Sequence, residues 1–152
     1  MTPEEALASI GLSLPEVAAP LAAYVPAVQT GSYVYTAGQI PLVKGELIAT
    51  GKVGAEVDPA RAAELAEVCA LNALAAVKSV VGDLGRVVRI VKVVGYVASA
   101  PGFTDHPAVL NGASELLGKV FGEAGKHARS AVGVAVLPKD APVEVELIAE
   151  VA

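Results

Sequence analysis

The sequence contains little charge, few aromatic residues and a single cysteine. Only 18% of its 152 residues are charged, 4% are aromatic, and tryptophan is absent. Cys69 has no second cysteine with which to form a disulfide within the chain, and it lies between apolar neighbours in a helical pattern. A buried, unreactive thiol is therefore expected at this position, rather than a nucleophile.

Clusters of basic residues and long apolar runs are also missing. The formal net charge is −5 and no basic run occurs, so the electrostatic pattern of a nucleic-acid-binding protein is absent. No run of 18 or more uncharged apolar residues occurs, and the first residues, Met-Thr-Pro-Glu-Glu, lack the basic start of a signal peptide. We therefore expect a soluble, cytoplasmic protein whose main partner is neither a membrane nor a nucleic acid.

Several familiar site motifs do not occur. His106 and His127 are 21 residues apart and neither has a second metal ligand nearby in the sequence, so no metal site is predicted. His106 is better explained as a residue at the start of a helix. The glycines of Gly82-Asp-Leu-Gly85 do not have the spacing of a phosphate-binding loop, and no Gly-x-Ser-x-Gly nucleophile motif is present.

Apolar residues are abundant instead. They make up 54% of the chain, and the mean hydropathy is +0.58. A chain of 152 residues fits one domain, 1–152, that can bury a core without disulfides. Because so little charge is left for the exterior, we expect part of the surface to be covered in a homo-oligomer. An alanine-rich composition bias would give the same totals and remains the alternative.

The hydrophobic pattern predicts an α+β fold. Proline or an Asp-Pro pair begins each predicted helix, valine and tyrosine alternate in the predicted strands, and glycines separate the elements. Irregular structure is expected from residue 14 to Tyr24. The expected elements are a helix at 3–10, a β-hairpin at 27–40 with its turn at Gly31-Ser32, a short strand or loop at 46–50, a helix at 58–80, a strand at 86–98, a helix at 106–121, and strands at 129–136 and 143–150.

This order places both long helices between strands. Right-handed crossovers then put the two helices on one face of a mixed sheet, and the other face stays uncovered and rich in valine. In the strand at 86–98, simple alternation puts Val88, Ile90, Lys92 and Val94 on one face. We expect the uncovered face to pack against other copies of the chain.

The last two predicted strands carry the candidate charged groups. Arg129 shares its strand face with Ala131, Gly133 and Ala135, and these small residues leave room for a ligand beside the guanidinium. A surface ion pair is the alternative explanation for Arg129. Glu144 and Glu146 alternate with valines, which a solvated or salt-bridged strand face would also explain.

The connection at 137–142 contains two prolines and an aspartate, which favour a turn. If it closes a simple hairpin, Glu144 lies opposite Ala135, and Arg129 is roughly 20 Å further along the strand at ~3.4 Å per residue. Arg129 and Glu144 would then act together only across two subunits, or in a sheet distorted away from this pairing. A single-subunit cleft that contains both groups would contradict this hypothesis.

Three segments carry a resemblance to a known family, and they extend over nearly the whole chain in the same order. The C-terminal segment, which begins Ala128-Arg-Ser-Ala-Val132 and continues through Leu137-Pro-Lys-Asp-Ala141 and Val143-Glu-Val-Glu146, closely resembles the signature of the RidA/YjgF family, also called endoribonuclease L-PSP. Tyr24-Val25 with Thr36-Ala-Gly-Gln-Ile-Pro41, and Val109-Leu-Asn111, agree with the same family.

The resemblance implies a chorismate-mutase-like fold, a homotrimer and ligand clefts between subunits. It also implies hydrolysis of reactive enamines and imines, such as 2-aminoacrylate and its imine tautomer, to 2-keto acids and ammonia without a cofactor. By resemblance, Arg129 binds the substrate carboxylate, for which a planar guanidinium is suited. Glu144 matches the acid that holds or activates water. Tyr24, the Gly38 backbone and Asn111 match residues that line the cleft.

The resemblance implies two more substrate-binding positions, Ala37 and Ala131, and at these two the chain departs from the family pattern. Ala37 stands where a Ser or Thr is common, and Ala131 stands where a Cys is common. The N-terminal extension at 1–20 and the longer segment at 42–57 resemble a longer subgroup of the family. A non-catalytic trimer that binds small carboxylates and an endoribonuclease-type activity remain alternatives to the deaminase.

Overall fold

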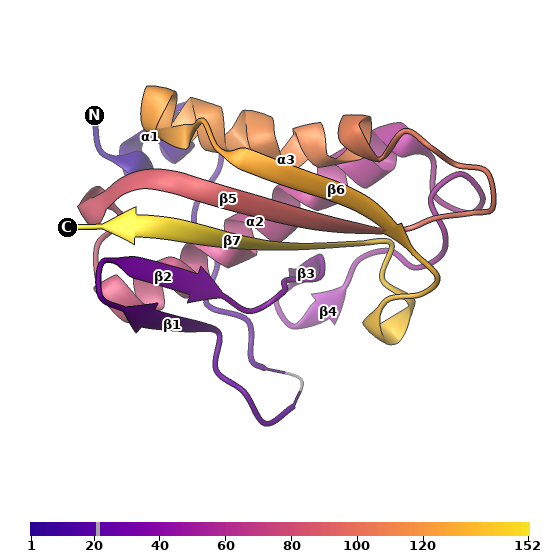
Figure 1. Cartoon of the computed structure of the whole chain (residues 1–152), viewed down its shortest axis with the longest axis horizontal. Coiled ribbons are helices and arrows are strands. Elements are labelled where there is room, and N and C mark those ends of the chain that lie inside the picture. The colour runs from indigo at the N-terminus through magenta and orange to yellow at the C-terminus, as the bar shows by residue number, and fades with distance from the viewer. Residues whose placement is uncertain (21) are drawn as a thin grey trace.

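The computed structural model describes residues 1–20 and 22–152, and its centre is a five-stranded mixed sheet (Figure 1). The strands lie in the order β1-β2-β7-β5-β6. Two strands of two residues, β3 and β4, form a separate small sheet. Of the irregular stretch expected up to Tyr24, Leu21 lies outside the described residues.

The helices begin where the sequence predicts them, because their caps are local. α1 (Pro3–Ser9) begins with a capping box between Thr2 and Glu5. In α2 (Pro59–Val81) the side chain of Asp58 accepts a hydrogen bond from the Arg61 amide. α3 (His106–Phe121) has Pro107 in its first turn. Three 3₁₀ turns follow the main elements: η1 (Leu84–Arg86), η2 (Gly122–Gly125) and η3 (Pro138–Asp140).

The predicted N-terminal hairpin is formed by β1 (Ala27–Thr30) and β2 (Tyr33–Thr36). β2 ends four residues earlier than Ile40, where the sequence places its end. The expected third strand at 46–50 is only the two residues of β4 (Glu46–Leu47), which pair with β3 (Leu42–Val43). Lys44 and Gly45 between them have positive φ angles of 52° and 82°, as a tight two-residue hairpin turn requires.

The predicted hairpin between the last two strands is wrong. β5 (Val87–Ala98) lies between β6 (Ala128–Val134) and β7 (Val143–Val151), and it pairs with β6 in parallel and with β7 antiparallel. The physical reason is the crossover through α3, which returns the chain parallel to β5 on one side. The connection through η3 is long enough to cross the end of β5, so β7 adds to its other side.

The predicted alternation along β5 is also wrong. The register with β7 shifts between Val87 and Arg89 and again between Ile90 and Lys92. Each irregularity changes which face the following residues occupy. Ile90 and Val93 are therefore both fully buried, although simple alternation puts them on opposite faces.

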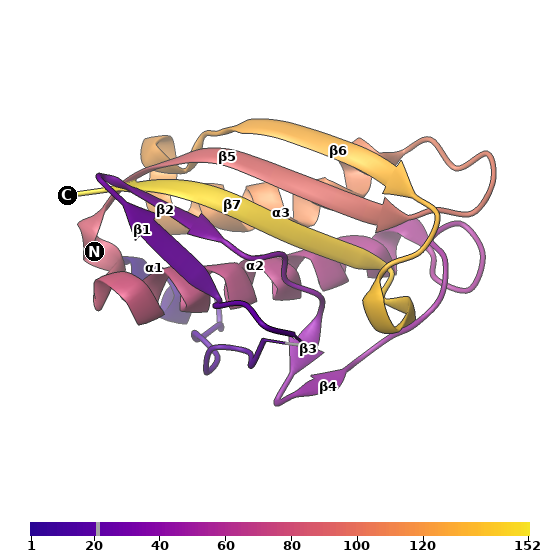
Figure 2. The same ribbon diagram turned by 60° about the horizontal axis from the view of Figure 1, so that its bottom comes forward.

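All three helices lie on one face of the sheet, which confirms the predicted arrangement (Figure 2). Leu7 of α1 and Cys69 of α2 are fully buried in the core beneath this face, and burial raises the pKa of the Cys69 thiol. The opposite face carries half-exposed large apolar side chains, namely Val28, Tyr33, Tyr35 and Val132. Within the described residues, no helix has the length and apolar character that a membrane span requires.

Candidate functional site

Arg129 lies near the start of β6 on the face that the helices cover. Its Nη1 donates to Asn111 Oδ1 at 2.9 Å and to Ser114 Oγ at 3.0 Å, and its Nη2 donates to the Pro107 carbonyl at 3.4 Å. All three acceptors belong to α3 and are neutral. Among the described residues, no carboxylate pairs with Arg129. The surface ion pair considered from the sequence is therefore not formed.

A shallow hollow of about 320 Å³ lies beside the Arg129 side chain, and its lining residues are Ser114, Gly125, Lys126, His127 and Arg129. His127 Nε2 is 2.9 Å from Ser114 Oγ, and His127 Nδ1 is 2.7 Å from the Gly125 carbonyl oxygen. Sequence reasoning did not select Ser114 or His127. The available signal was the spacing of two residues between His127 and Arg129, which puts both side chains on one strand face.

Glu144 lies on β7, on the face of the sheet opposite to the helices. It is half-buried, and this burial together with the nearby charge of Glu146 raises the pKa of its carboxyl group. A Cβ atom at Gly38 would lie only 2.8 Å from the carboxyl carbon of Glu144. Glycine at position 38 therefore leaves room for the Glu144 carboxylate in this position, and any larger residue would displace it.

Two backbone hydrogen bonds pair the Gly38 segment with β7, antiparallel and side by side. The Gln39 amide donates to the Val145 carbonyl at 2.8 Å, and the Val145 amide donates to the Gln39 carbonyl at 3.0 Å. The Ala37 amide donates to the Pro26 carbonyl at 2.8 Å. These backbone contacts fix Gly38 beside Glu144, and no side chain at position 38 takes part in them.

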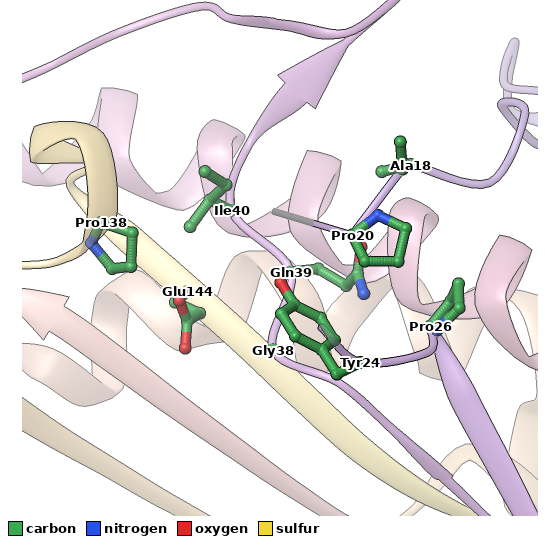
Figure 3. A pocket seen from close by; sticks show the side chains of 10 residues that line it. Ala18, Pro20, Tyr24, Pro26, Gly38, Gln39, Ile40, Pro138 and Glu144 are labelled. Atoms are coloured by element: carbon green, nitrogen blue, oxygen red, sulfur yellow. The ribbon is translucent and has the colours of Figure 1, made fainter. Parts of the chain in front are cut away.

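A small cavity of about 50 Å³ lies in front of Glu144 (Figure 3). Glu144 and Tyr24 lie on either side of the Gly38 backbone there, and Tyr24 is 46% exposed. The rest of the lining comes from the N-terminal extension, the residue before β1, the β2–β3 connection and η3, namely Ala18, Ala19, Pro20, Pro26, Gln39, Ile40 and Pro138. Of the predicted residues, Tyr24, Gly38 and Glu144 are therefore together.

Arg129 and Glu144 are not together within one chain. Arg129 is aligned with Val93, which is aligned with Leu147, whereas Glu144 is aligned with Tyr96, which is aligned with Val132. The two side chains are on opposite faces of the sheet and line different hollows. The expected separation is therefore present, although it arises from the strand order and not from a hairpin.

The comparisons with known proteins match this architecture. The family described as "YjgF/chorismate mutase-like, putative endoribonuclease" matches residues 4–151. The chain belongs to the RidA/YjgF family. The resemblance stated from the sequence motifs and the chorismate-mutase-like fold are thereby confirmed.

Three solved structures illustrate the range of this similarity. Atu1372 from Agrobacterium tumefaciens is 44% identical with a TM-score of 0.93, over 99% of this chain and 92% of that one. A "putative endoribonuclease" from Shewanella oneidensis is 38% identical with a TM-score of 0.96, over 99% and 100%. TdcF from E. coli, crystallised with bound serine, is 28% identical with a TM-score of 0.64, over 90% and 94%.

The positions at which this RidA/YjgF chain departs from the usual family residues differ in their surroundings. Ala131 is aligned with Gly95 of β5, and its side chain packs against the core. Ala37 lies next to Gly38, and its carbonyl accepts a hydrogen bond from Gln39 Nε2 at 3.2 Å. Neither methyl group can donate a hydrogen bond, so any polar contact at these two positions comes from the backbone alone.

Glu146 is a second acidic residue on the sheet face that the helices leave uncovered. The Tyr96 hydroxyl donates to Glu146 Oε1 at 2.5 Å, and this bond raises the pKa of Tyr96 to about 12. The nearby charge of Glu146 is one of the causes that raise the pKa of Glu144. Across the described ranges, no group of three His, Cys, Asp or Glu side chains is arranged to hold a metal ion.

Proposed function

We propose that the protein hydrolyses reactive enamines and imines, of the 2-aminoacrylate and 2-iminopropionate type, to 2-keto acids and ammonia. The proposed site lies in a cleft between subunits of a homotrimer. The observation that carries the proposal is the Arg129 guanidinium, which is held in place by neutral acceptors and has no acidic partner among the described residues.

The hydrogen bonds of Arg129 leave one edge of the guanidinium available. A guanidinium has five N–H donors. The two Nη1 hydrogens go to Asn111 and Ser114, and one Nη2 hydrogen goes to Pro107. The Nε–H and one Nη2–H remain. We propose that this Nη2–H is the one beside Nε, so that the two form one edge of the plane, where a carboxylate binds with both oxygens. A small 2-imino or 2-keto acid has the carboxylate that this edge fits.

Glu144 is the proposed base for the water. In its ionised form it takes one proton from a water molecule, whose oxygen bonds to C2 of the protonated imine. Glu144 then gives this proton to the nitrogen of the amino alcohol, and the C2–N bond breaks to release ammonia. The hydroxyl proton passes to the ammonia, which leaves as ammonium, while the C2–O bond becomes the keto group and Glu144 is again ionised. A raised pKa makes the Glu144 carboxylate a stronger base than an exposed one.

A second copy of the chain is part of the proposal, because Arg129 and Glu144 are on opposite faces of one sheet. The uncovered face with Val28, Tyr35 and Val132 supports association with other copies. In this arrangement Arg129 of one subunit would bind the carboxylate and Glu144 of a neighbouring subunit would activate the water. Tyr24, Gly38 and Asn111 would line the same cleft.

The direct test is the release of 2-keto acid when 2-aminoacrylate is generated in the presence of the protein. We expect Arg129→Ala to lower kcat/KM by about 100-fold, since it removes a charged bidentate contact. Arg61→Ala is the matched control, because Arg61 pairs only with Glu64 on the surface of α2. Equal keto-acid release with wild type, with Arg129→Ala and without protein would contradict the proposal.

A non-catalytic carboxylate binder is the second candidate, since TdcF was crystallised with serine, a small amino acid, bound to it. Calorimetric binding of 2-ketobutyrate without any turnover would favour this candidate. The family description also names an endoribonuclease. The net charge of −5 does not favour RNA binding, and a ribonuclease signal that survives Arg129→Ala would indicate a contaminant.

A further inference from the structure

A chain of three hydrogen bonds ends on Arg129 and begins at a backbone carbonyl. It runs from the Gly125 carbonyl of η2 to His127 Nδ1 at 2.7 Å, from His127 Nε2 to Ser114 Oγ at 2.9 Å, and from Ser114 Oγ to Arg129 Nη1 at 3.0 Å. It therefore connects η2, α3 and β6 at the point where the guanidinium sits.

The two ends fix the direction of every bond in this chain. A carbonyl oxygen only accepts, so the proton of neutral His127 is on Nδ1. His127 Nε2 then has a lone pair and accepts the Ser114 hydroxyl proton. A guanidinium only donates, so the Ser114 oxygen accepts from Arg129. Each group therefore donates or accepts in the only way that its neighbour in the network allows.

We propose that Ser114 and His127 are positioning residues for Arg129. His127 with its proton on Nδ1 turns the Ser114 lone pairs toward the guanidinium, and this holds the Nε–Nη2 edge outward for a carboxylate. That Ser114 and His127 order the Arg129 side chain does not depend on the proposed function. Their effect on carboxylate binding does rest on the proposed function.

The surroundings of His127 favour its neutral form. Burial and the charge of Arg129 lower the pKa of His127 from its usual value of 6.5. The other cation that lines the hollow, Lys126, pairs with Glu123 at 2.9 Å. Lys92 of β5 is aligned with Ala128 and faces the other side of the sheet. A protonated His127 would donate from Nε2 to the Ser114 oxygen, which already accepts from Arg129, so two cations would share one hydroxyl.

The first test reads the positions of the protons and the motion of Arg129 without any ligand. Nitrogen-15 NMR of the full chain at pH 8 is expected to show His127 with its proton on Nδ1 and slow rotation of the Arg129 guanidinium. Ser114→Ala is expected to speed this rotation by about tenfold, since it removes a hydrogen bond to a charged group, whereas Ser114→Thr keeps the hydroxyl and the slow rate. Lowering the pH through the pKa of His127 is expected to speed the rotation in the wild type but not in Ser114→Ala.

The chain offers a matched control in a second Ser–His pair. Ser99 Oγ lies 2.9 Å from His106 Nε2 and has no bond to Arg129. Ser99→Ala is therefore expected to leave the Arg129 rotation unchanged. A proton on His127 Nε2 at pH 8, or a rotation rate that Ser114→Ala does not change, would overturn the proposal.

The second test measures calorimetric affinity for 2-ketobutyrate at pH 8. Ser114→Ala is expected to weaken binding by about tenfold, and the double variant with His127→Ala to bind no more weakly than Ser114→Ala, because the two residues act as one unit. Independent, additive losses would overturn the proposal, as would unchanged affinity. If the wild type binds no 2-ketobutyrate and has no turnover, the proposed function fails, while the NMR result still decides whether Arg129 is positioned.

Discussion

The hollow around Arg129 and the cavity around Glu144 are built in different ways. Arg129 is held by side chains, because Asn111 and Ser114 of α3 both accept from its Nη1. Glu144 is placed beside backbone, because the Gly38 segment pairs with β7 and a Cβ atom at position 38 would displace the carboxylate. The first hollow has a cation without an acidic partner among the described residues. The second has the carboxylate of Glu144, whose pKa is raised by burial and by the nearby charge of Glu146.

This difference separates the two parts of the proposed chemistry. A cation on neutral acceptors binds an anion and changes affinity, whereas a half-buried acid exchanges a proton and changes rate. Variants near Arg129 should therefore act mainly on KM, and variants near Glu144 mainly on kcat. The opposite distribution would show that the two hollows do not have these separate roles.

The largest effect is expected from Glu144→Gln. Glutamine keeps the shape of the side chain but cannot accept the proton from water, so we expect kcat to fall by about 1,000-fold with KM nearly unchanged. Steady-state kinetics with 2-aminoacrylate measure both constants. A fall of less than tenfold in kcat would show that Glu144 is not the base.

The next effect is expected from Gly38→Ala, which tests whether backbone places Glu144. The added Cβ would meet the Glu144 carboxyl carbon at 2.8 Å, so the carboxylate must move, and we expect kcat to fall by about 100-fold. Gly118→Ala in α3 is the control, because nothing lies within 4 Å of its Cβ position. The control should keep full activity and raise the free energy of unfolding by about 0.5–1 kcal/mol in thermal denaturation.

A smaller effect is expected from Asn111→Asp. This change gives Arg129 an acidic partner, which it lacks among the described residues. The new carboxylate would compete with the substrate carboxylate for the guanidinium, so we expect KM to rise by about tenfold with kcat unchanged. Asn111→Ala removes the acceptor without adding charge and should raise KM less. A larger effect of the alanine variant would contradict this electrostatic explanation.

The smallest effect is expected from Glu146→Gln, measured as a pH–rate profile. Glu144 must be ionised to act as the base, so activity falls as the pH falls through its pKa. The charge of Glu146 contributes to raising that pKa, so its removal should move the acid limb to lower pH. Tyr96→Phe, which removes only the hydrogen bond to Glu146, controls for the lost contact. A shift to higher pH would contradict the assignment.

The sequence predicted the features that local rules determine. The Asp58 cap, the prolines in the first turns and the valine alternation set the positions of helices and strands to within a few residues. The strand order was not predictable in this way, because the pairing of β5 with both β6 and β7 depends on residues that are distant in the sequence. The bulges near Ile90 have no local turn signal either, so the faces of β5 were wrongly predicted.

The candidate site shows the same division. Arg129 and Glu144 could be selected from composition and from the family motif, but their partners could not. Ser114 becomes relevant only because α3 packs over β6, and Gly38 only because its segment pairs with β7. A glycine at a strand end and a serine in a helix are too common to predict a site without the tertiary structure.

The position of β7 in the sheet has a consequence for biosynthesis. β7 joins the N-terminal hairpin to β5, because it pairs with β2 on one side and with β5 on the other. The ribosome makes the hairpin strands first and β7 last of the strands described. The edge of β2 that pairs with β7 therefore stays unpaired until β7 has been made. The nascent chain therefore cannot complete its sheet before Val143–Val151 has left the exit tunnel.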